Sequence, residues 1–363
     1  VMILMWVGNI AQQMYNTVDS IVVGRDVGDN ALAAVGSAGP IFQLLLVLFA
    51  GIAVGAGIMV SQYFGAKARD ELSETIGCCI TLTILASLAL MILSPFIVRP
   101  LLELLDTPAS IIDWCDSYLM LLMIGIGRLA FYNILSGILR GMGDSVSALL
   151  YLLIATVMNI VLDIFFVKDL QMGVSGVALA TVIAQTFSGI LCLIRLMKMR
   201  DIFDLKLRYL RPKKKYCFSL IRLGIPSGLT QMILSMAMIV VQSLTNSFGE
   251  QFIAANVIVM RVDGFAMMPN FSFGTTMTTY AGQNVGARKY DRVYQGARQG
   301  TLIAMATSAT ITGLILIFGR QLMGIFTDTV SLVDLSRRMM GILALRPSHL
   351  HIRPYLLGTI PAD

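Results

Sequence analysis

Ionisable side chains inside long apolar runs are the residues of this chain whose types suggest chemistry. A charge in a membrane-spanning segment costs about 2.5–3.5 kcal/mol on insertion scales, so such a residue is a candidate for function. The acids of this kind are Asp19, in GNIAQQMYNTVDSIVVG, and Asp163, in VMNIVLDIFFV. The bases are Arg128 and Arg261, and Asp263 follows Arg261 by two residues. Carboxylates in such surroundings predict a site for a proton or a cation.

The spacing around the two acids brings polar groups onto their helix faces. Gln12, Tyr15 and Asp19 are three and four residues apart, so they share one face of a helix. Asn159 precedes Asp163 by four residues and shares its face in the same way. Structural alternatives stand beside this prediction. Asp19 is then a hydrogen-bond anchor between helices, and Asp163 is an ordinary acid near the outer membrane surface.

The two arginines are open to both a structural and a functional interpretation. Arg261 and Asp263 are two residues apart and do not face each other on a helix, so each needs another partner or a water-filled cleft. Pro269 follows and predicts a kink if the helix continues through it. Arg128 lies in the middle of the apolar stretch LMIGIGRLAFYN, and the sequence indicates no partner for it.

The elements that must position these residues are membrane-spanning helices. Apolar residues make up 56% of the 363-residue chain and charged residues 13%, and the mean hydropathy is +0.79. An average soluble domain is about 25% charged, and a spanning helix needs roughly 20 apolar residues. We therefore predict an all-α integral membrane protein. Its expected spans are 2–24, 31–62, 76–98, 114–139, 147–167, 174–197, 218–246, 252–283 and 297–318, with a tenth beginning near 335.

The chain also contains an internal repeat. Residues 1–124, shifted by 221 positions, lie on residues 222–345 without a gap, so that QYFGAKARD falls on QNVGARKYD. Six expected spans precede the second copy, and both copies therefore enter the membrane in the same direction. Such a parallel repeat predicts two six-helix lobes related by an axis along the membrane normal, with alternating access between them.

Basic residues predict the orientation and the lobe boundary. When alternate loops are assigned to alternate sides, 17 Lys and Arg residues fall on one side and 6 on the other. The richer side is expected to be cytoplasmic, with the start of the first span on that side. RPKKK at 211–215 then has a topological role, and a nucleic-acid site is disfavoured. The predicted domains are a first lobe (1–198), a basic cytoplasmic linker (199–217), a partial second lobe (218–345) and an aberrant tail (346–363).

Several enzyme classes lack their usual motifs here. The sequence contains no G-x-x-x-x-G-K-[ST], no H-E-x-x-H and no G-x-S-x-G, so we expect neither an ATP-driven pump nor a hydrolase, and no cofactor. The five cysteines match no metal-site or disulfide spacing and are expected to be lone small hydrophobes. An ion gradient is the natural energy source for such a protein.

The chain resembles the multidrug and toxic compound extrusion (MATE) family of prokaryotic efflux transporters. The resemblance rests on the stretches YNTVDSIVVG, AGIAVGAGIMVSQYFGA, LSGILRGMGDS, NIVLD, GVSGVALATVIAQ and MMPNFSFGTTMTTYAGQNVGA, in this order. It implies twelve helices in two lobes in the bacterial inner membrane, lipid as surroundings, and export of cationic or lipophilic small molecules against inward H⁺ or Na⁺ flow.

The resemblance also implies roles for individual residues. Asp19, Asn159, Asp163 and Thr181 match the cation-coupling site of the family's first lobe, where Na⁺ is the one metal ion expected, with Gln12 and Tyr15 as a supporting polar face. In the second lobe, Arg261 and Asp263 resemble an R-x-D pattern on the eighth helix of some members.

Two departures from the family pattern leave alternatives open. Arg128 stands where the family usually has a small residue or proline. After Leu345 the sequence reads RPSHLHIRPYLLGTIPAD instead of continuing the tenth span, so we expect a second lobe without its last helices. The alternative functions are a lipid-linked oligosaccharide flippase of a related superfamily and a truncated membrane protein without transport activity. The sequence leaves the substrate, the choice between H⁺ and Na⁺, and the oligomeric state open.

Overall fold

The protein is helical throughout the part that its structure, a computed structural model, describes. The described residues are 7–13, 29–104, 112–204, 206–246, 248, 250–324 and 329–344, and their regular elements are all helices. Six of these helices are long and apolar enough to cross a membrane. The predicted all-α membrane class is confirmed. The chain folds into two compact units, with the boundary between Met232 and Ile233 inside α7, whereas the predicted domain limits stay a prediction.

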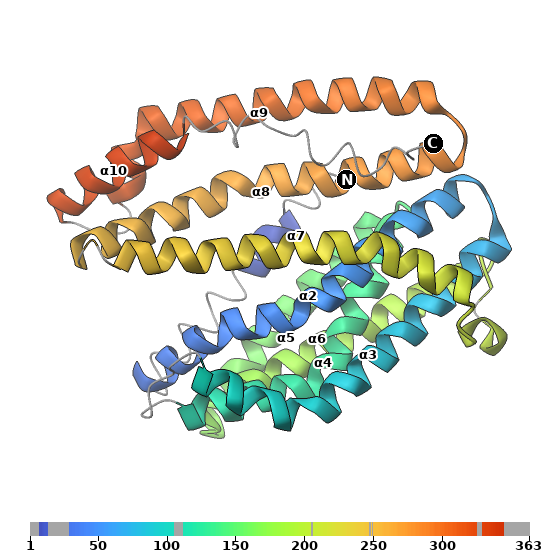
Figure 1. Ribbon diagram of the computed structural model, residues 1–363, viewed down its shortest axis with the longest axis horizontal. Coiled ribbons are helices and arrows are strands. Elements are labelled where there is room, and N and C mark those ends of the chain that lie inside the picture. Colours follow the sequence, from blue (N-terminus) through green and yellow to red (C-terminus); the bar gives the residue numbers. More distant parts are fainter. Residues whose placement is uncertain are drawn as a thin grey trace. The chain divides into compact units, whose positions relative to one another are not determined.

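The first unit is a bundle of long helices (Figure 1). Apolar runs of this length form helices in a membrane because every backbone N–H and C=O must find a partner within the segment. Residues 7–13 are helical as well. The long helices are α2 (Asp29–Gly65), α3 (Arg69–Leu104), α4 (Ile112–Gly141), α5 (Ser145–Ile164), α6 (Gly173–Lys198) and the first half of α7 (Lys214–Asn246).

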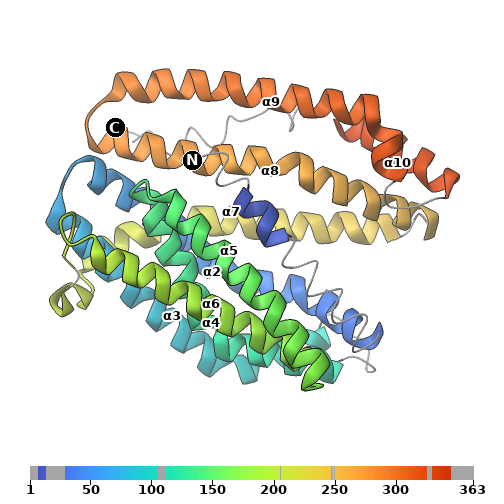
Figure 2. The ribbon, with the colours of Figure 1, turned by 180° about the vertical axis from the view of Figure 1, so that it is seen from behind.

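Helix α4 lies at the centre of this unit and packs on α2, α3 and α6. A Cβ atom at Gly125 would collide with Val182 of α6, and one at Gly189 of α6 would lie 3.7 Å from the Tyr132 nitrogen of α4. Both contacts pair residues of α4 and α6 that are 57 positions apart. The two helices therefore run in the same direction in a fixed register, side by side (Figure 2).

The corner between α4 and α5 is fixed by a cap. Asp144 accepts a hydrogen bond from the Ser147 backbone nitrogen at 3.1 Å, which satisfies a free N–H of the first turn of α5. Arg195 Nε of α6 lies 2.7 Å from Asp144 Oδ2. Partial burial by itself would raise the pKa of Asp144, but the hydrogen bonds from Arg195 and Ser147 outweigh it and the pKa is lowered. The α4–α5 corner is thus tied to the end of α6.

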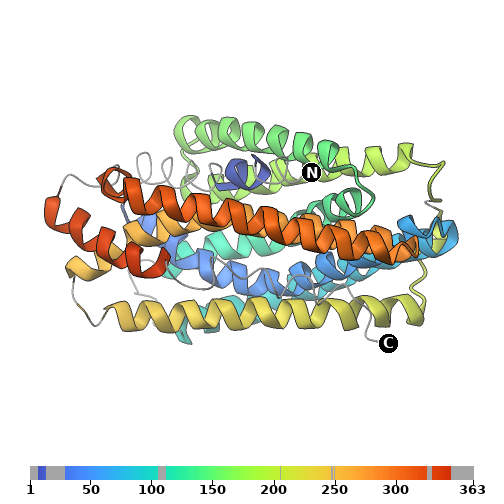
Figure 3. The ribbon, with the colours of Figure 1, turned by 90° about the horizontal axis from the view of Figure 1, so that it is seen from above.

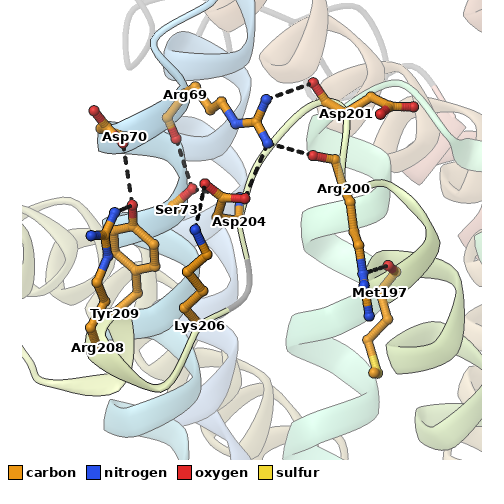
Figure 4. A network of polar contacts seen from close by, with 10 residues as sticks. All are labelled: Arg69, Asp70, Ser73, Met197, Arg200, Asp201, Asp204, Lys206, Arg208 and Tyr209. Atoms are coloured by element: carbon orange, nitrogen blue, oxygen red, sulfur yellow. Dashed lines mark hydrogen bonds and ion pairs between the residues drawn. The ribbon is translucent and has the colours of Figure 1, made fainter.

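Residues 199–213, which we call the strap, lie against the start of α3 (Figure 4). Arg69 Nη2 donates to the Arg200 carbonyl at 2.6 Å and to Asp204 Oδ1 at 3.1 Å. The Asp204 backbone nitrogen donates to Ser73 Oγ at 2.9 Å, and the Tyr209 hydroxyl donates to Asp70 Oδ1 at 3.2 Å. The polar start of α3 is therefore satisfied largely by residues about 130 positions later in the chain.

The strap has a buried apolar side and an exposed basic side. Phe203 and Tyr209 are 1% and 4% exposed, and the Tyr209 carbonyl lies where a side chain at position 77, a glycine, would be. The basic side chains Lys206, Arg208, Arg211 and Lys213 are exposed, and Lys213 also forms an ion pair with Glu74 of α3. The predicted polar linker is thus docked on the first unit by its apolar side chains.

One expectation for the cysteines is wrong. Cys78 of α3 and Cys217 of α7 form a disulfide, with their Cα atoms 6.2 Å apart, whereas Cys79, Cys115 and Cys192 are buried and are not disulfide-bonded. The two paired residues are separated by 139 positions. A spacing of this size fits no short motif, and only the packing of α7 on α3 reveals the pair.

The second unit contains the rest of α7 together with α8 (Glu250–Gly286), α9 (Tyr290–Gly324) and α10 (Val330–Ala344). Ile258, Val259, Met323 and Met340 are part of its apolar core. Ser308 Oγ of α9 donates to Asn270 Oδ1 of α8 at 3.0 Å, and Figure 3 shows α10 (red) beside one end of α9 (orange to red).

The repeat is present in the helix limits themselves. Helices α2 and α8 both contain 37 residues, and their first and last residues differ by the offset of 221 that the sequence predicts. Each is followed by a turn with one residue of positive φ, Lys67 at 55° and Arg288 at 57°. The shared offset therefore extends from the sequence to the backbone of the turns.

Candidate ion-coupling site

Helix α5 carries a buried polar face. Asn159 and Asp163 are both 0% exposed and lie one turn apart, on the side of α5 that also buries Ala155 and Thr156. Side chains of Asp are almost never fully buried unless they are paired or bind a ligand. An ordinary acid at the membrane surface would remain in contact with water, so complete burial favours a specific role for Asp163.

Helix α6 presents a matching set of polar residues. Thr181, Gln185 and Ser188 are buried on it, at 7%, 5% and 0% exposure. Ser188 Oγ donates to the Tyr151 carbonyl of α5 at 3.0 Å, which fixes the level of the two packed helices. Asn159 lies eight residues after Tyr151 on α5, and Thr181 lies seven residues before Ser188 on α6.

A helix rises 1.5 Å per residue, so this register gives the relative heights of the residues along the bundle. Because α5 and α6 are consecutive and antiparallel, eight residues on one and seven on the other cover nearly the same distance along the bundle. Asn159 therefore lies level with Thr181, and Asp163 lies about one turn further toward the start of α6. Of the residues predicted on the fifth and sixth spans, Asn159 and Thr181 thus share one level of the bundle, and Asp163 lies one turn away.

A π-helical turn at Phe165–Asp169 begins two residues after Asp163. The Leu170 nitrogen donates to the Phe165 carbonyl at 3.1 Å, and a Cβ at Gly176 of α6 would lie 3.1 Å from Phe166 Cβ. Glycine thus allows α6 to approach this widened turn closely. Single π-turns inside helices occur frequently at functional sites, and this one has no signature in the sequence.

The oxygen atoms of this region suit a hard cation or a proton. Within the described part of the chain, Thr181 Oγ1 and Gln185 Oε1 are buried and have no hydrogen-bond partner. Buried polar oxygens without a partner are costly, and a bound ion or proton removes this cost. The Asn159 amide and the Asp163 carboxylate, also buried, are the kinds of oxygen ligand that hard cations prefer.

The other predicted site residues are not all placed on this face. Tyr15 and Asp19 lie outside the described residues, and so does the side chain of Arg261. Gln12 is on the helical stretch 7–13 and is exposed, so it does not join the buried face of α5. Asp263 is half-buried on α8 in the second unit.

Sequence reasoning missed two buried polar residues near the site. Gln185 follows Thr181 by four residues and Thr156 precedes Asn159 by three, so each shares the face of a predicted residue. Thr156 Oγ1 donates to the Leu152 carbonyl at 2.9 Å and is satisfied within its own helix. Gln185 is the more informative omission, and the i, i+4 spacing from Thr181 is the signal that reveals it.

Comparison with known families gives the class of protein to which this site belongs. The family model described as MatE matches residues 5–165 and 226–346, most of the chain. The chain belongs to the MATE family. The family match includes Asn159 and Asp163, and its second segment spans most of the second copy of the repeat.

Individual MATE relatives agree with this assignment. The chain is 30% identical over 341 residues to the probable multidrug resistance protein YoeA of Bacillus subtilis, covering 92% of this chain and 74% of YoeA. It is 22% identical over 356 residues to the probable multidrug resistance protein NorM of Thermotoga maritima, covering 97% of this chain and 76% of NorM.

Solved structures share the fold. A crystal structure of MATE in complex with MaD3S superposes with a TM-score of 0.89 and 26% identity, covering 99% of this chain and 81% of that one. A MOP superfamily transporter from Pyrococcus furiosus gives a TM-score of 0.88 and 25% identity, covering 99% and 81%. This MATE protein is therefore a multi-pass membrane protein of a multidrug efflux transporter family, with the two-lobe architecture that the repeat predicted.

Proposed function

We propose that this MATE protein exports cationic or lipophilic small molecules in exchange for inward H⁺ or Na⁺, and that Asp163 is central to the ion site. The observation that carries the proposal is the complete burial of Asp163 and Asn159 on α5, with Asn159 level with Thr181 of α6 and Asp163 one turn further. The names of the relatives support a drug-like substrate class.

The mechanism follows from the cost of burying a charge. An isolated carboxylate in an apolar interior is strongly unfavourable, and binding of H⁺ or Na⁺ neutralises it. The closed, ion-loaded state is thus stabilised, and release requires an opening that admits water to Asp163. Alternation of the two lobes between the two sides of the membrane provides such an opening, so ion binding and substrate release are linked through one conformational change.

Other residues have supporting roles in this proposal. Asp19 on the first span supplies a second carboxylate, and Asn159 and Thr181 supply neutral oxygens. Arg261 and Asp263 are the candidates for a polar site in the second lobe. The basic loops, which include the exposed side of the strap, are placed in the cytoplasm, with the start of the first helix on the same side.

The proposal is tested by dye efflux from proteoliposomes that contain the purified chain. A pH gradient and a Na⁺ gradient are imposed separately, and export of a cationic dye is followed by fluorescence. Hydrogen bonds to charged groups contribute about 1.5–3 kcal/mol, so Asp163→Asn is expected to weaken ion-driven efflux by about tenfold or more.

A matched control is available six residues away. Asp169 is an exposed acid at the end of the π-turn, and Asp169→Asn is expected to leave efflux unchanged. Ion-driven efflux that is equal in wild type and Asp163→Asn would overturn the ion site. Binding of a lipid-linked pyrophosphate, without binding of organic cations, would instead support the flippase function.

A further inference from the structure

Arg128 is an exposed cation on an otherwise apolar side of the first unit. It lies on α4 beside Ile124, which is 54% exposed, and the neighbouring exposed residues of α6 include Phe187 and Ile190, at 43% and 50%. Exposed apolar side chains of this kind on spanning helices are typical of a surface that contacts lipid. Arg128 is therefore a charged residue on a lipid-facing surface, where charges are rare and costly.

The depth of Arg128 follows from the register of α4 and α6. The contacts of Gly125 with Val182 and of Gly189 with Tyr132 place Arg128 level with Gln185. At 1.5 Å per residue, Arg128 then lies about 18–20 Å from either end of α6. The hydrocarbon core is about 30 Å thick, so Arg128 is near its middle, far from both layers of headgroups.

A groove surrounds this side chain. It has a volume of about 290 Å³ and is lined by Arg128 and Phe131 of α4 and by Thr186, Gly189, Ile190 and Leu193 of α6, among others. The hydroxyl of Thr186 donates to the Val182 carbonyl at 2.6 Å, so its proton is already used within α6. The remaining walls are mostly apolar.

Among the described residues that line the groove, Arg128 alone carries a formal charge. Helix α6 contains no Asp or Glu, and the acids of α4, Asp113 and Asp116, precede Arg128 by at least three turns. Within the described residues, no hydrogen bond or ion pair is assigned to Arg128. The groove thus combines five unused N–H donors with an apolar track, which fits an anion that carries an apolar tail.

We propose that this groove binds a fatty-acid-type carboxylate that enters sideways from the bilayer, with the carboxylate on Arg128 and the tail along α4 and α6. The depth selects this anion over a phospholipid. A phosphodiester stays charged and is held at the headgroup layer, whereas a carboxylic acid enters the hydrocarbon in its neutral form. On binding, the acid releases its proton to the water that accompanies a charged side chain at this depth, and the planar guanidinium pairs with the resulting carboxylate through two parallel hydrogen bonds.

The experiment measures binding of radiolabelled oleate to the chain in nanodiscs of neutral phosphatidylcholine. Wild type is expected to bind oleate saturably, and an excess of oleyl alcohol, which has the same chain but no charge, is expected not to displace it. Arg128→Leu and Arg128→Gln are expected to bind at least about tenfold more weakly. Arg211→Leu, which removes an exposed arginine of the strap, is the control and keeps the wild-type affinity.

Three results would overturn the proposal. They are oleate binding that is equal in wild type and both Arg128 variants, displacement of oleate by oleyl alcohol, and displacement when the nanodiscs contain phosphatidylglycerol, which would assign the groove to a phospholipid. Binding is measured without an ion gradient, so the outcome is independent of the proposed ion coupling. Thermal unfolding of each variant confirms that it is folded.

Discussion

The turn between α2 and α3 and the turn between α8 and α9 have the same backbone and different surroundings. In the first, Ala66, Lys67 and Ala68 donate from their backbone nitrogens to the carbonyls of residues 62, 64 and 63. In the second, Ala287, Arg288 and Lys289 donate in the same way to residues 283, 285 and 284. Every donor and acceptor is shifted by 221 positions.

The surroundings of the two turns differ because the strap covers only the first. Ser73 after the first turn is 1% exposed, whereas Tyr294, its counterpart after the second, is 70% exposed. Gly77, against which the strap lies, corresponds to Arg298, which is exposed. The repeat thus determines local backbone geometry, and the linker between the copies determines which copy is covered.

The largest effect is expected when the strap loses its buried aromatic side chain. Phe203 is 1% exposed, and truncation of a buried Phe to Ala costs about 3–5 kcal/mol. Phe203→Ala should therefore lower the apparent melting temperature and make the lysines and arginines of the strap sensitive to trypsin. Phe218→Ala, at a residue that is 63% exposed, is the control. Equal melting of the two variants would contradict a docked strap.

A smaller effect is expected from a methyl group under the strap. A Cβ at Gly77 would collide with the Tyr209 carbonyl, and overpacking of this kind costs about 1–3 kcal/mol. Gly77→Ala should destabilise the first unit, whereas Arg298→Ala at the equivalent exposed position should be nearly neutral. Thermal unfolding in detergent compares the two, and a neutral Gly77→Ala would show that the strap does not contact α3 closely.

The shared backbone conformation of the two turns predicts that equivalent substitutions in them give similar small gains in stability. A left-handed backbone conformation costs a non-glycine residue about 1–2 kcal/mol. Glycine avoids this cost, but part of the gain is lost because glycine raises the conformational entropy of the unfolded chain. Lys67→Gly and Arg288→Gly should therefore stabilise by similar amounts, of about 1 kcal/mol or less. Unequal shifts in melting temperature would mean that the turns are not equivalent, and Lys289→Gly, which lacks a positive φ, is the control.

The smallest effect is expected from the ion pair of Arg69 and Asp204. The hydrogen bond from Arg69 lowers the pKa of Asp204. A lowered carboxyl pKa stabilises the fold above the ordinary value of about 3.9, and this stabilisation is lost as the pH falls through the lowered value. The melting curves of wild type and Arg69→Gln should differ at neutral pH and converge in acid, whereas Tyr290→Gln at the equivalent position should show no such pH dependence.

The sequence predicted what depends on length, hydropathy and register. The spans expected at 31–62 and 252–283 lie within α2 and α8, and the family resemblance is confirmed by the match to MatE. Asn159 and Asp163 share a buried face, as their spacing predicted. These features follow from the period of a helix and from the offset between two copies, which are properties of neighbouring residues.

Other features depend on packing between distant segments and left no local signal. The disulfide of Cys78 with Cys217 and the docking of the strap each join residues more than 100 positions apart. The face of Arg128 was equally hidden, because α4 is apolar around most of its circumference and its sequence does not distinguish a lipid-facing side from a buried one. The π-turn after Asp163 changes hydrogen bonds without changing composition.

The position of the strap in the chain also sets an order of events during synthesis. Arg69 and its partner Asp204 are 135 residues apart, so the start of α3 leaves the ribosome long before its cover exists. At roughly 5–20 residues per second, this delay is on the order of ten seconds. During that time Arg69, Asp70 and Ser73 are available to water or to a chaperone. The equivalent start of α9, around Tyr290 and Asp291, is not covered by the strap, so no such delay applies to it.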